Sequence, residues 1–291
     1  MDSVSDSIIS AISQIFRNMF SSIDDSIYSA LDKISFIDDS IMSSPYLSNT
    51  IGHTSSSGIL LIANGLLIGF VLYFAIKYIL ANFSIGNPQN PYKFVLKIII
   101  IGIIMNNCFF ICEQIININS SISSGIRSIG QNVLGTKICF SNLIKILNSI
   151  VSIEENSESF FSIDGIIKTI VSIGFLNLIF VFSVRYIMLK VFILFSPFAI
   201  LFMSLDSTSG FFKAWFKSFI SLLLIELFSS LILIIMFSIQ YSPTDIVSKI
   251  LFVGSIFALT KVNSFIRDIF GGISLDFQNS LYSLRNINTL K

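Results

Sequence analysis

The first 57 residues carry apolar side chains at helical spacing. These recur every three or four positions from Val4 to Leu31, with Ser and Asp between them. That is the pattern of an amphipathic helix with one apolar stripe. Seven Asp against Arg17 and Lys33 make the region acidic, which disfavours binding to anionic lipid heads. We therefore interpret residues 1–57 as an amphipathic extramembrane region that offers a docking face to a partner.

Long apolar stretches follow, and each is long enough to predict a membrane-spanning helix. The predicted crossings are Gly58–Leu80, Phe94–Ile111, Ile166–Val184, Tyr186–Met203 and Phe211–Met236. The third and fourth belong to one apolar run, and we expect a tight turn at Arg185 to separate them. A sixth stretch, Ile246–Leu259, is short and follows Pro243, so it either crosses the membrane or forms a re-entrant helix. We prefer five crossings.

The chain therefore divides into five regions. After the N-terminal region come a first transmembrane pair (58–111), a polar loop with helical fragments (112–165), a core helix cluster (166–260) and a C-terminal tail (261–291). Isoleucine stripes at helical spacing predict the fragments in the loop.

Composition sharpens this picture. Hydrophobic residues make up 53% of the 291 and charged residues only 12%, whereas a soluble domain carries roughly 25% charged residues. This excludes a soluble globular protein, and the apolar content excludes a disordered one. The predicted fold class is an all-α, polytopic transmembrane bundle of about five and at most six spans, in contact with membrane lipid.

Basic residues in the short connections predict the orientation of the chain. Lys93, flanked by Lys77 and Lys97, lies in a connection without acids, which should therefore be cytoplasmic. Alternation then puts Arg185 and Lys190 on the same side. The acidic N-terminal region and the loop 112–165 fall outside, and with five crossings the basic tail ends in the cytoplasm. The loop before Phe211 should be outside and yet is followed by two Lys, which does not fit.

We find no residues arranged for catalysis. The phosphate-binding loop, the zinc helix with two His and the nucleophile elbow are all absent from the sequence. One His and three Cys leave little for a metal site, so we expect neither metal nor cofactor and no enzyme. Cys108 and Cys112 are expected to pack inertly in a span, while a disulfide between Cys112 and Cys139 is left open.

Five residues are candidates for translocation or assembly. Glu226 lies deep in the fifth crossing, where a carboxylate should face protein or water. It could line a polar passage, pair with Arg185 or Lys190, or hold two helices together. Arg185 and Lys190 could equally extend their side chains to the cytoplasmic surface. Pro197 should kink its helix, either as a gate or to fit its neighbours, and Trp215 should lie at a membrane interface.

The stretch from Ser183 to Phe228 resembles a known family. The dipeptide Arg185-Tyr186 leads into an apolar run with a central Pro197, and a short polar loop is followed by Phe-Lys-Ala-Trp-Phe-Lys at Phe212–Lys217. This resembles the TrbL-like polytopic inner-membrane subunits of type IV secretion and conjugation systems. The chain is shorter than is usual in that family, and its helices are poorer in Ala and Gly.

The resemblance implies a channel or platform subunit in the inner membrane that helps DNA or protein to cross and supports pilus assembly. The implied partners are the secretion ATPases, bitopic scaffold subunits and pilin, transient contacts with the translocated DNA or protein, and further copies of the chain in a homo-oligomer. The alternative is a subunit of a small-solute secondary transporter or permease. Such a protein should show an internal repeat, which we do not find, and Glu226 is the one convincing charge at mid-membrane.

Overall fold

The computed structural model confirms an all-α membrane protein. It describes residues 32–37, 41–42, 45–51, 58–83, 91–143, 163–204, 208–239 and 246–270, with the single positions 11 and 146. Every long element in these ranges is a helix, and the same ranges contain no strand. The predicted stripe from Val4 to Leu31 and the tail after residue 270 lie outside the described residues.

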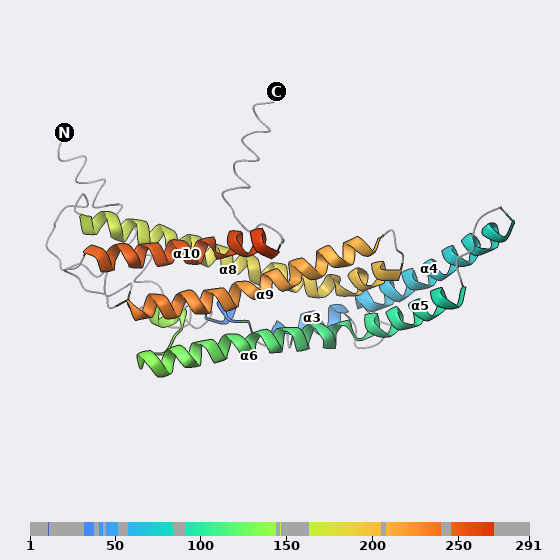
Figure 1. Cartoon of the computed structure of the whole chain (residues 1–291), viewed down its shortest axis with the longest axis horizontal. Helices are drawn as coiled ribbons and strands as arrows, with labels where there is room; N and C mark the ends of the chain where they lie inside the picture. The colour runs from blue at the N-terminus through green and yellow to red at the C-terminus, as the bar shows by residue number, and fades with distance from the viewer. Residues whose placement is uncertain are drawn as a thin grey trace, which may run out of the picture.

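The helices run lengthwise in an elongated arrangement (Figure 1). They are α3 (Pro45–Ile51), α4 (Gly58–Phe83), α5 (Pro91–Asn106), α6 (Cys108–Leu134), α8 (Ile163–Leu201), α9 (Ser209–Ser238) and α10 (Ile246–Phe270), with the 3-10 turn η2 (Phe202–Ser204) after α8. In Figure 1, α6, α8, α9 and α10 lie side by side, while α4 and α5 extend beyond them as a hairpin. Because α9 packs against α6, α8 and α10, it is the centre of this four-helix group.

Four of the described helices are long and apolar enough to cross a membrane, and the number rises to five if the bent pair α5–α6 is one crossing. The predicted number of crossings therefore agrees with the structure, but the helices that make these crossings differ from the predicted ones. The apolar stretch Ile246–Leu259 is too short for us to have preferred it as a crossing. In the structure, however, the helix that begins at Ile246 continues to Phe270 and is long enough to span a membrane.

The predicted turn at Arg185 is wrong. Residues Ile163–Leu201 form one helix of 39 residues, and Arg185 lies in its interior. At 1.5 Å per residue this helix is about 58 Å long, nearly twice the hydrocarbon thickness of a bilayer. Arg185 can stay inside an apolar helix because groups from other parts of the fold bind its charge.

The second predicted crossing, Phe94–Ile111, contains a break. Helices α5 and α6 meet at Asn107 with a bend of 60°. The Asn107 side-chain amide donates to Ile103 O at 2.8 Å, and that of Asn106 donates to Gly102 O at 2.8 Å. Because such amides compete for the carbonyls that helix hydrogen bonds need, two adjacent Asn favour a break.

Helix α6 is continuous to Leu134, so the predicted isoleucine stripe from Ile115 to Ile129 lies on one helix. It ends at Gly135, whose φ of 69° and N–H bond to Gln131 O (2.8 Å) form a left-handed cap. Its isoleucine stripe is partly outward: Ile118, Ile122 and Ile129 are exposed. The buried face instead includes the polar residues Asn119 and Ser123.

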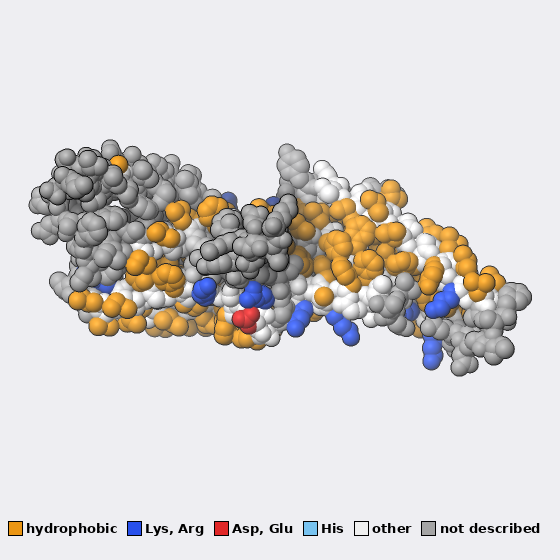
Figure 2. Space-filling view, turned by 90° about the horizontal axis from the view of Figure 1, so that it is seen from above, with side chains coloured by type: hydrophobic (Ala, Val, Ile, Leu, Met, Phe, Trp, Pro, Cys, Tyr) orange, Lys and Arg blue, Asp and Glu red, His pale blue; other side chains and the backbone are white. Residues whose placement is uncertain are grey.

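Much of the molecular surface is apolar, as expected where lipid replaces water. The face in Figure 2 shows broad apolar areas, with Lys and Arg side chains mostly along one edge. Exposed residues of α4 include Ile62, Ile68 and Leu72, each more than half exposed. Within the hairpin, Asn64 and Asn106 exchange side-chain hydrogen bonds of 3.1 and 3.2 Å, a polar contact that joins apolar helices.

Candidate functional site: a buried charge pair in the helix bundle

The bundle buries one ion pair completely. Arg185 in α8 and Glu226 in α9 approach to 3.3 Å between Nη2 and Oε2, and both side chains are 0% exposed. Glu226 lies near the middle of α9, and Arg185 lies within the apolar window Leu176–Ser204 of α8. Of the alternatives for Glu226, the structure contains the pairing with Arg185, and this same pair joins α8 to α9.

Arg185 uses all three of its nitrogens, on two other parts of the chain. Nε donates to Leu222 O in α9 at 2.9 Å, and Nη1 donates to Ser35 O at 2.9 Å. Nη2 donates to Glu226. The planar guanidinium presents its donors in a fixed fork, so Arg185 joins α8, α9 and the segment 32–37 in one geometry.

Glu226 collects donors on one oxygen. Oε2 accepts from the backbone N–H of Ile37 and from Nδ2 of Asn119, both at 3.2 Å, in addition to Arg185. The second oxygen, Oε1, is buried and has no hydrogen-bond partner among the described residues. The hydrogen bonds to the carboxylate thus converge on Oε2.

A seam of small polar side chains continues from this pair along α6 and α9. Ser230 Oγ donates to the backbone carbonyl of Glu226 at 2.9 Å. Ser123 Oγ lies 2.9 Å from Ser230 Oγ and donates to it, because the single hydroxyl proton of Ser230 is already bonded to Glu226 O. Ser229 is also fully buried, but its hydroxyl has no partner.

The segment 32–37 is fixed at several points beyond the ion pair. Oδ1 of Asp32 accepts from the backbone N–H groups of Phe140 (2.8 Å) and Ser141 (3.4 Å), and Oδ2 accepts from the Ser141 hydroxyl. The Phe36 ring lies 3.6 Å from Cζ of Arg127, a cation–π contact, and 5.4 Å from the Phe140 ring. Backbone, charge and aromatic contacts therefore hold the segment against α6, α8 and α9.

Physical chemistry explains why these partners occur together. Non-helical backbone is tolerated at membrane depth only where it is buried in protein or lines a water-filled cavity. Ser35 O and Ile37 N, at the end of a short helical turn, find their partners in Arg185 and Glu226. Conversely, a charge isolated in the span would be expensive, and these backbone groups help to solvate it.

The other three sequence candidates lie elsewhere. Lys190 is half-buried, with Nζ 4.7 Å from the Tyr186 ring centroid. Pro197 is buried inside α8, which ends four residues later at Leu201. Trp215 is only 8% exposed and donates from Nε1 to Phe192 O at 3.1 Å. The structure thus brings together two of the five candidates, Arg185 and Glu226.

Sequence reasoning missed Asn119, Ser123 and the segment 32–37. Asn119 and Ser123 are four positions apart and so share one helix face, which is a usable signal. It was obscured because the region 112–165 is polar throughout. Ser35 and Ile37 contribute backbone atoms to the pair, and such contacts leave no trace in residue identity.

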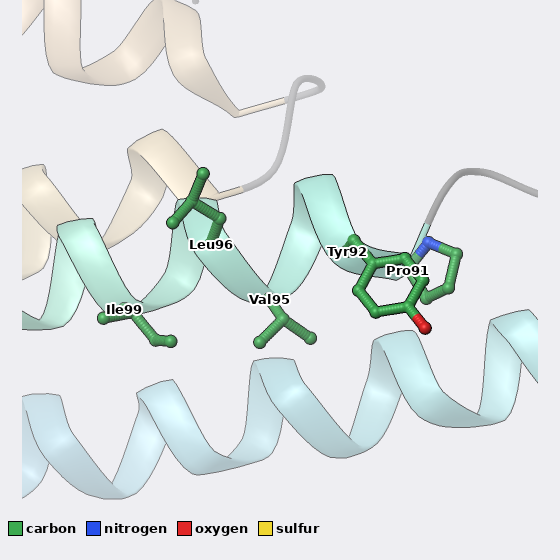
Figure 3. A pocket seen from close by; sticks show the side chains of 5 residues that line it. All are labelled: Pro91, Tyr92, Val95, Leu96 and Ile99. Carbon is green, nitrogen blue, oxygen red and sulfur yellow. The ribbon is translucent and has the colours of Figure 1, made fainter.

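The described residues offer little other site chemistry. No three His, Cys, Asp or Glu side chains among them converge to hold a metal ion. Cys108, Cys112 and Cys139 are all free and buried. A shallow groove along α5 (Figure 3) is lined by Pro91, Tyr92, Val95, Leu96 and Ile99. This lining suits hydrocarbon rather than a polar ligand.

Comparison with known proteins adds no relative: no family model, curated protein or solved structure matches the chain.

Proposed function

We propose that this chain is an integral-membrane channel or platform subunit of a type IV secretion apparatus, which helps DNA or protein to cross the inner membrane and supports pilus assembly. One observation carries the proposal. The buried pair Arg185–Glu226 holds the backbone at the end of a short helical turn among the span-length helices. Such backbone at membrane depth is a feature of proteins that pass polar material.

The resemblance supports the same function. The stretch Ser183–Phe228, which resembles TrbL-like subunits, runs from the interior of α8 into α9. It contains both members of the buried pair. It also contains Trp215, which joins α9 to α8 through its bond to Phe192. The part of the sequence that suggested the family is therefore the part that builds the polar centre.

The proposal includes an orientation. If α5–α6 is one crossing, the chain crosses five times, with the N-terminus outside and the tail in the cytoplasm. Because α8 is a single helix, the connection between α8 and α9 then lies on the cytoplasmic side. Lys213 and Lys217 follow this connection, so the two lysines that did not fit the predicted orientation now agree with the positive-inside rule.

The proposal is tested by affinity purification of the tagged chain from its native cells in mild detergent, with co-purifying proteins identified by mass spectrometry. We expect a secretion ATPase, a bitopic scaffold subunit or a pilin. A tagged multi-span protein of unrelated function is the control for non-specific recovery. Purification of the chain alone, or with a solute-binding protein, would contradict the secretion function.

One observation favours the alternative, a small-solute transporter subunit. Glu226 Oε1 is buried near the middle of a span without a partner, and such carboxylates serve in ion-coupled transport. Against this, Oε2 of the same carboxylate is already paired with Arg185. The transporter predicts that Glu226→Gln abolishes ion-coupled uptake of a solute in proteoliposomes while the protein still inserts and folds.

A further inference from the structure

Residues 32–37 enter the bundle as a separate piece of chain. Ser35, Phe36 and Ile37 are buried, although their partners Arg185 and Glu226 lie 150 and 189 residues further along the sequence. No described helix connects them directly to α6, α8 or α9. The segment therefore occupies a seat that the later helices form.

At Ser35 and Ile37, the seat binds the backbone of the segment. Arg185 donates to Ser35 O, and Glu226 accepts from Ile37 N–H. The Ser35 hydroxyl is buried but has no partner. Recognition at this point depends on two main-chain groups and not on the side chain of Ser35.

Charge also favours docking of the segment. The seat contributes two guanidiniums, Arg127 and Arg185, and one carboxylate, Glu226, so it carries one positive charge in excess. Asp32 supplies the second carboxylate, and both acids attract Arg127. The segment thus neutralises the seat, while Lys33 points to the exposed side.

When residues 32–37 are docked, some buried polar atoms lack a hydrogen-bond partner. Among the described residues, Glu226 Oε1 and Ser35 Oγ find no hydrogen-bond partner, and both are buried. A buried polar group without a hydrogen-bond partner destabilises the state that buries it. Withdrawal of the segment would admit water to these atoms, and this gain offsets part of the contacts that are lost.

We infer that residues 32–37 form a removable plug, whose withdrawal opens a polar gap between α6, α8 and α9. The gap is lined by Arg127, Arg185 and Glu226, each of which contacts the docked segment. Docking and release are properties of this chain alone. What passes through the gap rests on the proposed function, in which the plug controls the passage.

The test measures access to the buried segment by thiol labelling. In a background with Cys108, Cys112 and Cys139 replaced by Ser, Ile37→Cys is compared with Lys33→Cys, using a water-soluble maleimide on the purified full chain. Ile37 is 1% exposed and Lys33 is exposed, so Ile37→Cys should react at least tenfold more slowly. Equal rates would contradict docking of the segment.

Release is tested by adding Asp32→Asn to the Ile37→Cys chain. This removes charge-assisted bonds worth about 1.5–3 kcal/mol, so labelling should accelerate about 10- to 100-fold. Ser35→Ala is the matched control, because the Ser35 hydroxyl has no partner, and it should not accelerate labelling. No effect of Asp32→Asn, or an equal effect of Ser35→Ala, would overturn the proposal.

The fluorescence of Trp215, the single Trp in the chain, reports whether the bundle stays intact. A removable plug predicts faster labelling with unchanged emission, because Trp215 packs between α8 and α9 and not on the segment. A red shift that accompanies the faster labelling would show that residues 32–37 are part of the core and would refute the plug. These readings use isolated protein, so their outcome is independent of the partners recovered by affinity purification.

Discussion

At the scale of single residues, the role of the buried cation Arg185 is set by the groups that it binds. Its three nitrogens bind Leu222 O, Ser35 O and Glu226 Oε2. A lysine has the same charge but one nitrogen on a flexible stem, and it cannot reproduce a planar fork. The specificity of the site lies in this geometry as much as in the charge.

Substitution of Arg185 tests this account. Arg185→Gln leaves Glu226 buried without a counter-charge and should lower the free energy of unfolding by about 3–5 kcal/mol. Arg185→Lys keeps the charge but loses hydrogen bonds, so we expect a loss of about 1.5–3 kcal/mol. Both are measured by equilibrium unfolding in detergent micelles.

Lys190→Gln is the control for that series, because Lys190 is half-buried and lies over Tyr186. It should change stability by less than about 1 kcal/mol, the size of an exposed cation–π contact. If Lys190→Gln lowered the free energy of unfolding as much as Arg185→Gln, any cation in α8 would stabilise the fold equally. That result would contradict a specific role for the planar guanidinium of Arg185.

The sequence identified Arg185 and Glu226 because charges in an apolar run are conspicuous. It did not identify Asn119, since one more amide in a polar stretch is not conspicuous. It could not identify Ser35 O or Ile37 N, because every residue except proline offers the same two main-chain groups. The charged residues of the site could therefore be predicted from the sequence, whereas its amide and main-chain groups could not.

At the scale of elements, close approach between helices is set by small residues. Gly130 in α6 lies against α9, where an added Cβ would come within 2.6 Å of Ile234 Cγ1. Ile is β-branched and stiff at χ1, so the side chain cannot simply move away. The same helix contains Gly125, where an added Cβ would meet nothing within 4 Å.

These two glycines form a matched pair. Gly130→Leu should separate α6 from α9 and destabilise the fold by about 1–3 kcal/mol through overpacking. Gly125→Leu should be neutral or stabilising by up to about 1 kcal/mol, since Leu favours the helix over Gly. Thermal unfolding in detergent distinguishes them, and equal behaviour would contradict the described α6–α9 contact.

Element boundaries were predicted least well where tertiary contacts decide them. The turn at Arg185 is wrong because local sequence could not reveal a partner in α9. The break at Asn107 was missed because neither Gly nor Pro stands at the break itself, between Asn106 and Cys108. Helix type and apolar length depend on local sequence, and these were predicted well.

At the scale of the whole molecule, the proposed orientation follows from the number of crossings. Five crossings leave the two ends of the chain on opposite sides of the membrane. The tail after α10 carries Arg285 and Lys291, and α10 itself ends near Arg267. The positive-inside rule therefore supports a cytoplasmic tail.

This orientation is tested with single cysteines in the Cys-free background. With an impermeant thiol reagent on intact cells, Ile287→Cys should stay unlabelled until the membrane is permeabilised. Ser152→Cys, in the predicted outer loop, should be labelled directly and serves as the matched control. Direct labelling of Ile287→Cys would indicate an even number of crossings.

The separation between the charges of the pair has a consequence for how the protein is made. Arg185 precedes Glu226 by 41 residues, so at about 5–20 residues per second the ribosome supplies the carboxylate roughly 2–8 seconds later. In that interval, an unpaired arginine in α8 would cost about 3 kcal/mol at the bilayer centre. Helices α8 and α9 should therefore leave the insertion machinery together as a hairpin. Residues 32–37, although synthesised first, can take their place only after both have arrived.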